Sequence, residues 1–113
     1  MTAARPSRKM KALENLAGQF DTALFKALSE PARIELLKFL ILRGPSDIES
    51  IAAQFPQDRS VISRHIGALR EVGIVRCAKR GRHLVCNVDA QAFIKKLDAI
   101  VAEVRRAVAE CCP

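Results

Sequence analysis

The feature that most constrains this chain is a basic segment, DRSVISRHIGALREVG (residues 58–73), which reads as one amphipathic helix. Asp58 is a helix-capping residue type, and Gly73 is the residue type that ends helices in the left-handed conformation. The apolar residues between them recur at helical spacing and are predicted to be core: Val61, Ile62, Ile66, Leu69 and Val72. Because these residues share one face, the basic residues must face solvent.

A shorter helix is predicted just before this segment, in SDIESIAAQF (residues 46–55). Ser46 followed three residues later by Glu49 is a capping box, and Pro56 ends the helix. Two short helices joined by a tight proline turn, with the second one basic, are the pattern of a helix-turn-helix. Residues 46–73 are therefore predicted to form a helix-turn-helix.

The period of the sequence changes after Gly73. IVRCAKRGRHLVCNV (residues 74–88) is rich in β-branched residues that alternate along the chain, and Arg80-Gly81 is a turn signal. This pattern predicts a β-hairpin with a basic tip. A helix-turn-helix followed by such a hairpin is a winged helix.

Helices are predicted on both sides of this unit. ALENLAGQFDTALFKAL (residues 12–28) indicates two helices with a break at Gly18. SEPARIELLKFLILRGP (residues 29–45) starts at Ser29 with Pro31 in its first turn, and it stops at Gly44-Pro45. Because it is apolar almost all round, it is expected to be the buried central helix.

The chain ends in a long predicted helix that Asp89 caps. Its apolar stripe continues in register to Cys111 and comprises Phe93, Leu97, Ile100, Val101, Val104 and Val108. Such a stripe suits a partner helix, so this helix is expected to be a dimerisation element.

Length and composition favour one helical domain. With 113 residues, half of them hydrophobic and neither Trp nor Tyr among them, the chain is expected to fold as one domain over residues 1–113, with residues 1–11 as a flexible basic arm. No apolar run approaches the length of a membrane span, and no apolar stretch of a signal peptide follows the basic N-terminus. We expect a cytoplasmic protein whose four cysteines are reduced thiols.

The positive charge is concentrated where the helix-turn-helix and hairpin are predicted. The formal net charge is +7, and between Asp58 and His83 seven basic residues stand against two acidic ones. A phosphate-facing surface requires such an excess, although a solvated basic face is the alternative. No carboxylate pair, activated nucleophile or phosphate-binding loop stands out, so we do not expect an enzyme.

FKALSEPARIELLKFL (residues 25–40) and DRSVISRHIGALREVGIVRCAKRGRHLVCNV (residues 58–88) together resemble the ArsR/SmtB family of dimeric bacterial repressors, which sense metals, metalloids or thiol chemistry. The resemblance covers roughly residues 20 to 105. It implies a mainly α fold with a small β-hairpin, a winged helix-turn-helix with N- and C-terminal dimerisation helices. It also implies a homodimer on double-stranded operator DNA, in which half-sites of an inverted repeat lie about one helical turn apart.

The resemblance also implies which residues contact DNA. The exposed first turns of the recognition helix present Arg59, Ser60, Ser63, Arg64 and His65. The wing tip presents Lys79, Arg80 and Arg82, which would reach the neighbouring minor groove or the backbone. For His65, a bond to a local carbonyl is the alternative.

The signal that such a repressor would sense is less direct in this sequence. The family's metalloid-binding Cys-x-Cys positions align with Asp47 and Glu49, and the C-terminal helix has no histidine for a zinc site of the family's kind. What remains is sulfur, which favours As(III), methylated As(III), Sb(III) or another thiophilic ion as the inducer. The adjacent Cys111 and Cys112 can supply two thiolates.

A third thiolate is expected from the partner subunit. The last helix, with about 23 residues, would be roughly 34 Å long, so Cys86 cannot easily reach Cys111 of its own chain. If the terminal helices pair antiparallel, Cys86 of the partner, or Cys77 in its place, would complete the site. Alternatively, Cys77 and Cys86 are small hydrophobic residues of the hairpin. Two other functions stay open: a repressor of the same fold that senses thiol redox state, and a winged helix that binds a protein instead of DNA.

Overall fold

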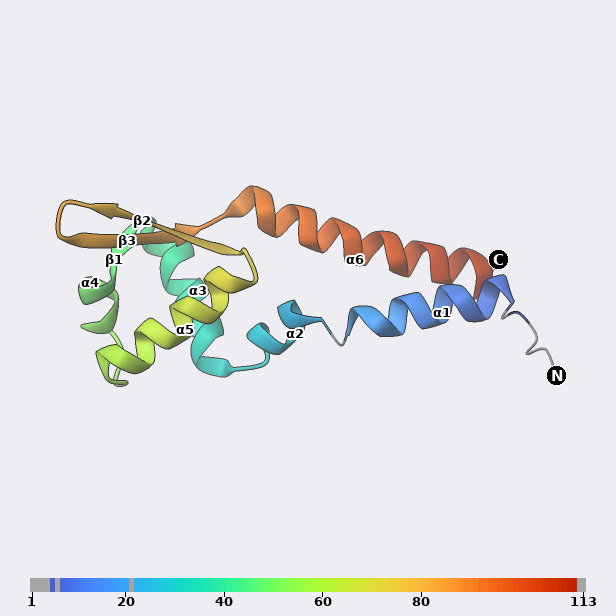
Figure 1. Ribbon diagram of the computed structural model, residues 1–113, viewed down its shortest axis with the longest axis horizontal. Helices are drawn as coiled ribbons and strands as arrows, with labels where there is room; N and C mark the ends of the chain where they lie inside the picture. The colour runs from blue at the N-terminus through green and yellow to red at the C-terminus, as the bar shows by residue number, and fades with distance from the viewer. Residues whose placement is uncertain (1–4, 6, 21, 112–113) are drawn as a thin grey trace. The chain divides into compact units, whose positions relative to one another are not determined.

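The structure is a computed structural model that describes residues 5, 7–20 and 22–111. The chain forms two compact units: one runs from Ala23 to Phe93, and the other joins the residues before Ala23 to those after Phe93 (Figure 1). The prediction of one domain over residues 1–113 stays a prediction. The elements, in chain order, are α1 (Arg8–Gln19), α2 (Ala23–Leu28), α3 (Pro31–Arg43), β1 (Ser46–Asp47), α4 (Ile48–Ala52), α5 (Arg59–Glu71), β2 (Val75–Arg80), β3 (His83–Val88) and α6 (Ala90–Cys111).

Helix α3 is the central helix of the Ala23–Phe93 unit, as predicted, but only one of its faces is buried. It begins at Pro31, whose fixed φ suits the first turn, and it ends at Gly44 with φ 77°. Leu36, Leu37 and Leu40 are buried. Near its C-terminal end, however, Ile41 is 65 % and Leu42 82 % exposed. The expectation of a helix buried all round is therefore wrong, because the unit packs against one side of α3.

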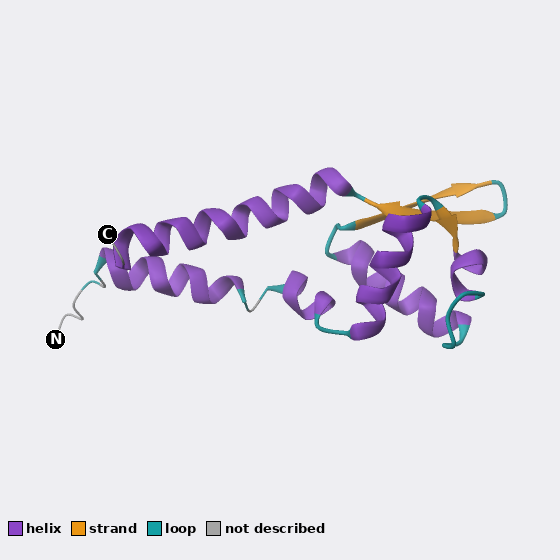
Figure 2. Cartoon of the chain, turned by 180° about the vertical axis from the view of Figure 1, so that it is seen from behind, coloured by secondary structure: helices purple, strands orange, loops and turns teal. Residues whose placement is uncertain are grey.

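The predicted helix-turn-helix is formed by α4 and α5 (Figure 2). The residue that caps α4 is Asp47, whose carboxylate accepts a hydrogen bond from the Ser50 backbone N–H at 2.7 Å. The predicted capping box at Ser46 is wrong, because α4 begins at Ile48, directly after Asp47, and the Ser46 hydroxyl donates to the Gly44 carbonyl at 3.0 Å instead. Helix α5 begins after Asp58, as predicted, and Gly73 follows it with φ 83°.

The hairpin after α5 is confirmed, and it lies in a sheet of three antiparallel strands in the order β1-β3-β2. Its turn consists of Gly81 and Arg82, one residue later than predicted, and Gly81 has φ 62°. The largest fully buried side chains of the described residues lie beneath this sheet and around α5: Leu36, Leu40, Ile51, Ile62, Ile66, Leu69, Ile74 and Cys86.

The second unit consists of α1 and most of α6. The Ser7 hydroxyl accepts a hydrogen bond from the Met10 backbone N–H at 3.0 Å, so α1 begins at Arg8. Residues 8–11, predicted to belong to a flexible arm, are therefore helical. Helix α1 also continues through Gly18 to Gln19, so the predicted break at Gly18 comes later. The side chains of Arg8 and Glu110 lie 3.6 Å apart, which brings the first turn of α1 to the last turn of α6.

Helix α6 begins after Asp89, as predicted. The Asp89 carboxylate accepts a hydrogen bond from the Ala92 backbone N–H at 3.1 Å, which satisfies one of the free donors of the first turn. Among the helices of the described residues, none is both long and apolar enough to cross a membrane.

Candidate nucleic-acid interface and thiol sites

The recognition helix α5 buries one face and exposes the one predicted to read DNA. Ile62, Ile66 and Leu69 are at most 2 % exposed. On the opposite side, four of the predicted DNA-contacting residues are exposed: Arg59, Ser60, Ser63 and Arg64. These side chains carry the guanidinium and hydroxyl donors that bind phosphates and base edges. This face is thus chemically suited to a DNA groove.

His65 is the fifth residue of this helix that is predicted to contact DNA, and its ring is hydrogen-bonded to Arg33 of α3. Its Nδ1 accepts a hydrogen bond from Nε of Arg33 in α3 at 3.2 Å, and the Arg33 Nη1 also donates to the Ala27 carbonyl at 3.4 Å. His65 is only half-exposed. An Nδ1 that accepts a hydrogen bond carries no proton, so any donation by this ring would come from Nε2. The partner of the His65 Nδ1 is thus the Arg33 side chain and not the local backbone carbonyl of the alternative prediction.

The wing tip exposes all three predicted cations. Lys79, Arg80 and Arg82 flank the turn at Gly81, and each is exposed. Two arginines and a lysine within four residues make this tip strongly positive, which suits contact with a phosphate backbone.

Two acidic residues near the start of α4 tie the wing and the recognition helix to each other. Asp47 lies 3.0 Å from Nδ1 of His83 in β3, and Glu49 lies 3.8 Å from the guanidinium of Arg59 in α5. The Ser50 hydrogen bonds hold the pKa of Asp47 below its ordinary value, with a smaller contribution from the charge of His83. A hollow of about 210 Å³ lies between these groups and the wing. Asp47 and Glu49 are the positions at which the resemblance to the family would place its Cys-x-Cys pair, and both are carboxylates here.

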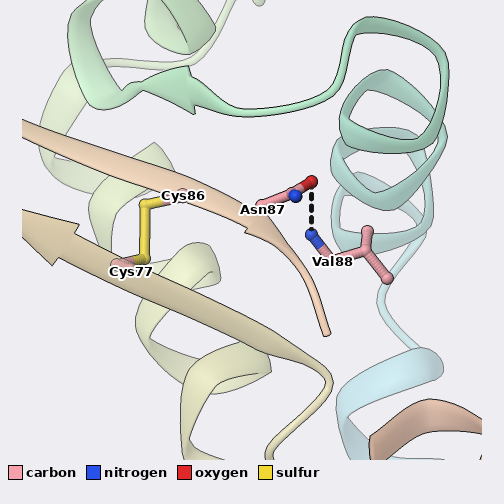
Figure 3. Close-up of a disulfide and its surroundings, with 4 residues drawn as sticks. All are labelled: Cys77, Cys86, Asn87 and Val88. Carbon is pink, nitrogen blue, oxygen red and sulfur yellow. Dashed lines mark hydrogen bonds between the residues drawn. A yellow bond between two sulfur atoms is a disulfide. The ribbon is translucent and has the colours of Figure 1, made fainter. Parts of the chain in front are cut away.

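The thiols of the wing are joined to each other. Cys77 of β2 and Cys86 of β3 are direct cross-strand partners that form a disulfide, with their Cα atoms 4.1 Å apart (Figure 3). The expectation of four reduced thiols is wrong for this pair, because the hairpin register places the two sulfurs against each other. Cys86 is fully buried, whereas Cys77 is half-exposed. While the disulfide is closed, neither sulfur is a thiolate that could bind a metalloid.

The C-terminal thiols are described only in part. Cys111 is a free cysteine, the last residue of α6, and is half-exposed. Cys112 lies outside the described residues. Among the residues that the structure does describe, no three His, Cys, Asp or Glu side chains lie close enough together to hold a metal ion. The predicted site of Cys111, Cys112 and Cys86 therefore stays a prediction.

Comparison with known proteins decides the family. Residues 30–76, from α3 to the start of β2, match the family model of bacterial regulatory proteins of the arsR family. Over 92 residues the chain is 32 % identical to the HTH-type transcriptional regulator Rv0081 of Mycobacterium tuberculosis, an alignment that covers 76 % of this chain and 81 % of the relative. The chain belongs to the ArsR family. It is thus a winged helix-turn-helix transcriptional regulator, and the family is not one of enzymes.

Solved structures agree with this ArsR-family assignment. A crystal structure described as that of a "possible transcriptional regulator for arsenical resistance" is 32 % identical, with a TM-score of 0.60, and the match covers 78 % of this chain and 95 % of that one. The winged helix-turn-helix domain of Mb0332 from Mycobacterium bovis, described as homodimeric, has 22 % identity and a TM-score of 0.56 over 99 % of this chain and 94 % of that one. The second likeness concerns the fold alone.

Proposed function

We propose that this ArsR-family regulator is a homodimeric repressor that binds an inverted-repeat operator and leaves it when a thiophilic ligand, such as As(III), is captured by cysteine thiolates. The exposed basic face of α5 carries the DNA-binding part of the proposal. Arg64 and its neighbours would enter the major groove, and the wing tip would follow the adjacent backbone.

An exposed apolar seam on α6 supports the homodimer. Its side chains are 42 to 52 % exposed and are separated alternately by three and four residues: Ile94, Leu97, Val101, Val104 and Val108. This is the spacing with which one helix packs along another in a coiled coil. Residues of this size are rarely left in water along a whole helix face. The homodimeric M. bovis domain supports a second copy of this chain as the occupant.

The same seam supports a sensing role for the C-terminal thiols. Cys111 follows Val108 by three residues and so stands at the next position of the seam. In an antiparallel pairing centred on Val101, Cys111 of one subunit would lie beside the first turn of the partner subunit's α6. That turn directly follows the strand that carries Cys86, so a third thiolate would come from the partner subunit.

The state of the wing disulfide determines which ligand the proposed site can take. Inorganic As(III) binds three thiolates, so it would need a reduced Cys86 or Cys77 in addition to Cys111 and Cys112. A monomethylated As(III) needs two thiolates, which the C-terminal pair alone supplies. We therefore expect methylated As(III) to act on both the oxidised and the reduced protein, and arsenite or Sb(III) on the reduced protein.

Arsenical-driven release from DNA tests this proposal. A labelled duplex selected from a random-sequence pool by the purified protein would be titrated with arsenite and with methylarsenite. We expect Cys111→Ser and Cys112→Ser to abolish release by both. Loss of release by arsenite alone is expected in Cys86→Ala if Cys86 supplies the third thiolate, and in Cys77→Ala if Cys77 does. Ala99→Ser, on the exposed outer side of α6, is the matched control, because it introduces a serine away from every cysteine. Unchanged release in the two C-terminal variants would refute metalloid sensing by this pair.

A second candidate, control of DNA binding by thiol redox state, is favoured by one observation: the Cys77–Cys86 disulfide. Operator affinity that changes with peroxide or with a thiol reductant, in the absence of any metalloid, would support this candidate.

A further inference from the structure

We propose that the Cys77–Cys86 disulfide is a reversible modification site that holds the wing in its DNA-binding conformation, with a low-molecular-weight thiol such as glutathione as its reaction partner. The inference rests on the proposed DNA-binding role. It gives redox control a place, the wing, and a direction: the oxidised protein binds DNA more tightly than the reduced one.

The disulfide occupies the register at which all three strands meet. Cys86 is on the central strand, where it pairs with Cys77 on one side and with Ser46 on the other. Ser46 directly precedes Asp47, the residue that caps the first helix of the helix-turn-helix. Through Cys86, the disulfide therefore connects β2 to the strand from which α4 begins.

The two sulfurs differ in access, which sets the order of the chemical steps. Cys77 is half-exposed and Cys86 is fully buried, so an incoming thiolate attacks the Cys77 sulfur. The S–S bond breaks, Cys86 leaves as a thiolate and takes up a proton, and Cys77 is held in a mixed disulfide. A second thiolate attacks the mixed disulfide, which releases Cys77 as a thiol and yields the small disulfide. Two electrons and two protons pass to the protein, and oxidation by glutathione disulfide is the reverse sequence.

Few interactions other than the pairing of its two strands hold the outer half of the wing. Residues 78–83 are all exposed, and they include the three cations of the tip. Beyond the disulfide, the wing has its ladder of hydrogen bonds and the His83–Asp47 ion pair, whose His83 side chain is 58 % exposed. Exposed ion pairs contribute little, and a two-stranded ribbon is marginal in water. Opening the disulfide would therefore allow the tip to fray.

A frayed tip weakens DNA binding because its cations must then be ordered when they meet phosphates. Each dimer carries two wings, so this cost is incurred twice. We expect the reduced protein to bind the selected duplex about tenfold more weakly than the oxidised protein, a coupling within the usual range for regulated binding.

The test compares oxidised and reduced full-length protein on the selected duplex by fluorescence anisotropy. The protein is equilibrated with glutathione buffers of defined ratio, and thiol alkylation with mass spectrometry reports the state of each cysteine. Cys77→Ala leaves the buried Cys86 in place, and we expect it to bind like the reduced protein in every buffer. Ala99→Ser, on the exposed outer side of α6 and outside both the wing and the C-terminal thiol pair, serves as the matched control and should respond like the wild-type protein.

Hydrogen exchange on the DNA-free protein gives an independent readout. We expect the backbone amides of residues 78–85 to exchange faster after reduction, while those of α5 keep their rates. Equal affinity of the two redox forms on a duplex that both bind, or unchanged exchange in residues 78–85, would overturn the inference. If no duplex is enriched by either form, the DNA-binding role itself fails, and the exchange rates still decide whether the disulfide orders the wing.

Discussion

The dependence of operator affinity on salt is the sharpest test of the proposed interface, because the proposal names the cations that would contact phosphates. Five of the predicted DNA-contacting residues of each protomer are exposed cations: Arg59, Arg64, Lys79, Arg80 and Arg82. A dimer therefore presents twice that number. If each cation neutralises one phosphate, the slope of log K against log salt is about −9. Doubling the salt concentration would then weaken binding roughly 500-fold.

Removing the wing cations should change this slope by a calculable amount. Alanine at Lys79, Arg80 and Arg82 leaves two cations per protomer and a slope of about −3.6, so that doubling the salt weakens binding only about 12-fold. The measurement is fluorescence anisotropy of a labelled duplex over a series of KCl concentrations. The control variant carries alanine at three exposed cations outside the interface, Lys26, Lys95 and Arg105, and loses the same net charge.

Two results would refute this reasoning. A wing variant whose slope stays within about one unit of the wild-type value would show that the tip does not contact phosphates. An equal loss of slope in the control variant would show that the net charge of the protein matters and the position of the cations does not.

Three further predictions concern stability and assembly. Reduction of the Cys77–Cys86 disulfide, which closes a loop with a sequence separation of 9, should lower the free energy of unfolding by about 2.7 kcal/mol, or roughly 1–2 M in urea midpoint; an equally large effect of the reductant on Cys77→Ala, which has no disulfide to reduce, would contradict this. Val101→Glu places a charge in the apolar seam and should make the proposed dimer sediment as a monomer in analytical ultracentrifugation. Ala99→Glu, off the seam, should leave the sedimentation unchanged. Because the pKa of Asp47 is lowered in the folded state, this residue stabilises the protein above the ordinary aspartate pKa of about 3.9. The stability difference between Asp47→Ala and wild type, measured by urea unfolding, should therefore shrink as the pH falls through and below that value.

The helix-turn-helix and wing could be predicted from the sequence because periodicity and punctuation agree there. The apolar residues of α5 follow helical spacing, and Gly73 and Gly81 stand where the chain needs positive φ. The predicted cap of α4 is one residue too early, since Ser46 and Asp47 are both capping residue types and nothing local decides between them. The chain is aligned there by pairing with β3, whose Cys86 is 40 residues away from Ser46.

The disulfide does not follow from the sequence pattern because the predicted turn of the hairpin is one residue too early. A two-residue turn at Arg80-Gly81 would pair Cys77 with Leu84 and Cys86 with Val75, so that each cysteine would have an apolar partner. The turn at Gly81-Arg82 moves the register so that Cys77 faces Cys86. The position of the turn fixes which residues face each other across a hairpin. Moving the turn by one residue therefore decides whether the two cysteines pair with apolar residues or with each other.

The contact between Arg33 and His65 could not be predicted by any local signal. The two residues are 32 positions apart, and each belongs to a helix whose exposed and buried sides were judged separately. Only the packing of α3 against α5 brings the guanidinium to the imidazole.

The acidic pair at the start of α4 has a consequence for how this regulator can change its inducer. The resemblance to the ArsR/SmtB family implies that the family's metalloid-binding Cys-x-Cys pair aligns with these two positions. Here Asp47 caps α4 and holds His83, and Glu49 faces Arg59. Introducing Asp47→Cys and Glu49→Cys would thus remove a helix cap and two ion pairs in the step that adds two thiols. A chain that acquired the Cys-x-Cys pair would therefore pass through less stable variants. Changes at the cysteines of the wing and of the C-terminus would not carry this cost in stability at α4.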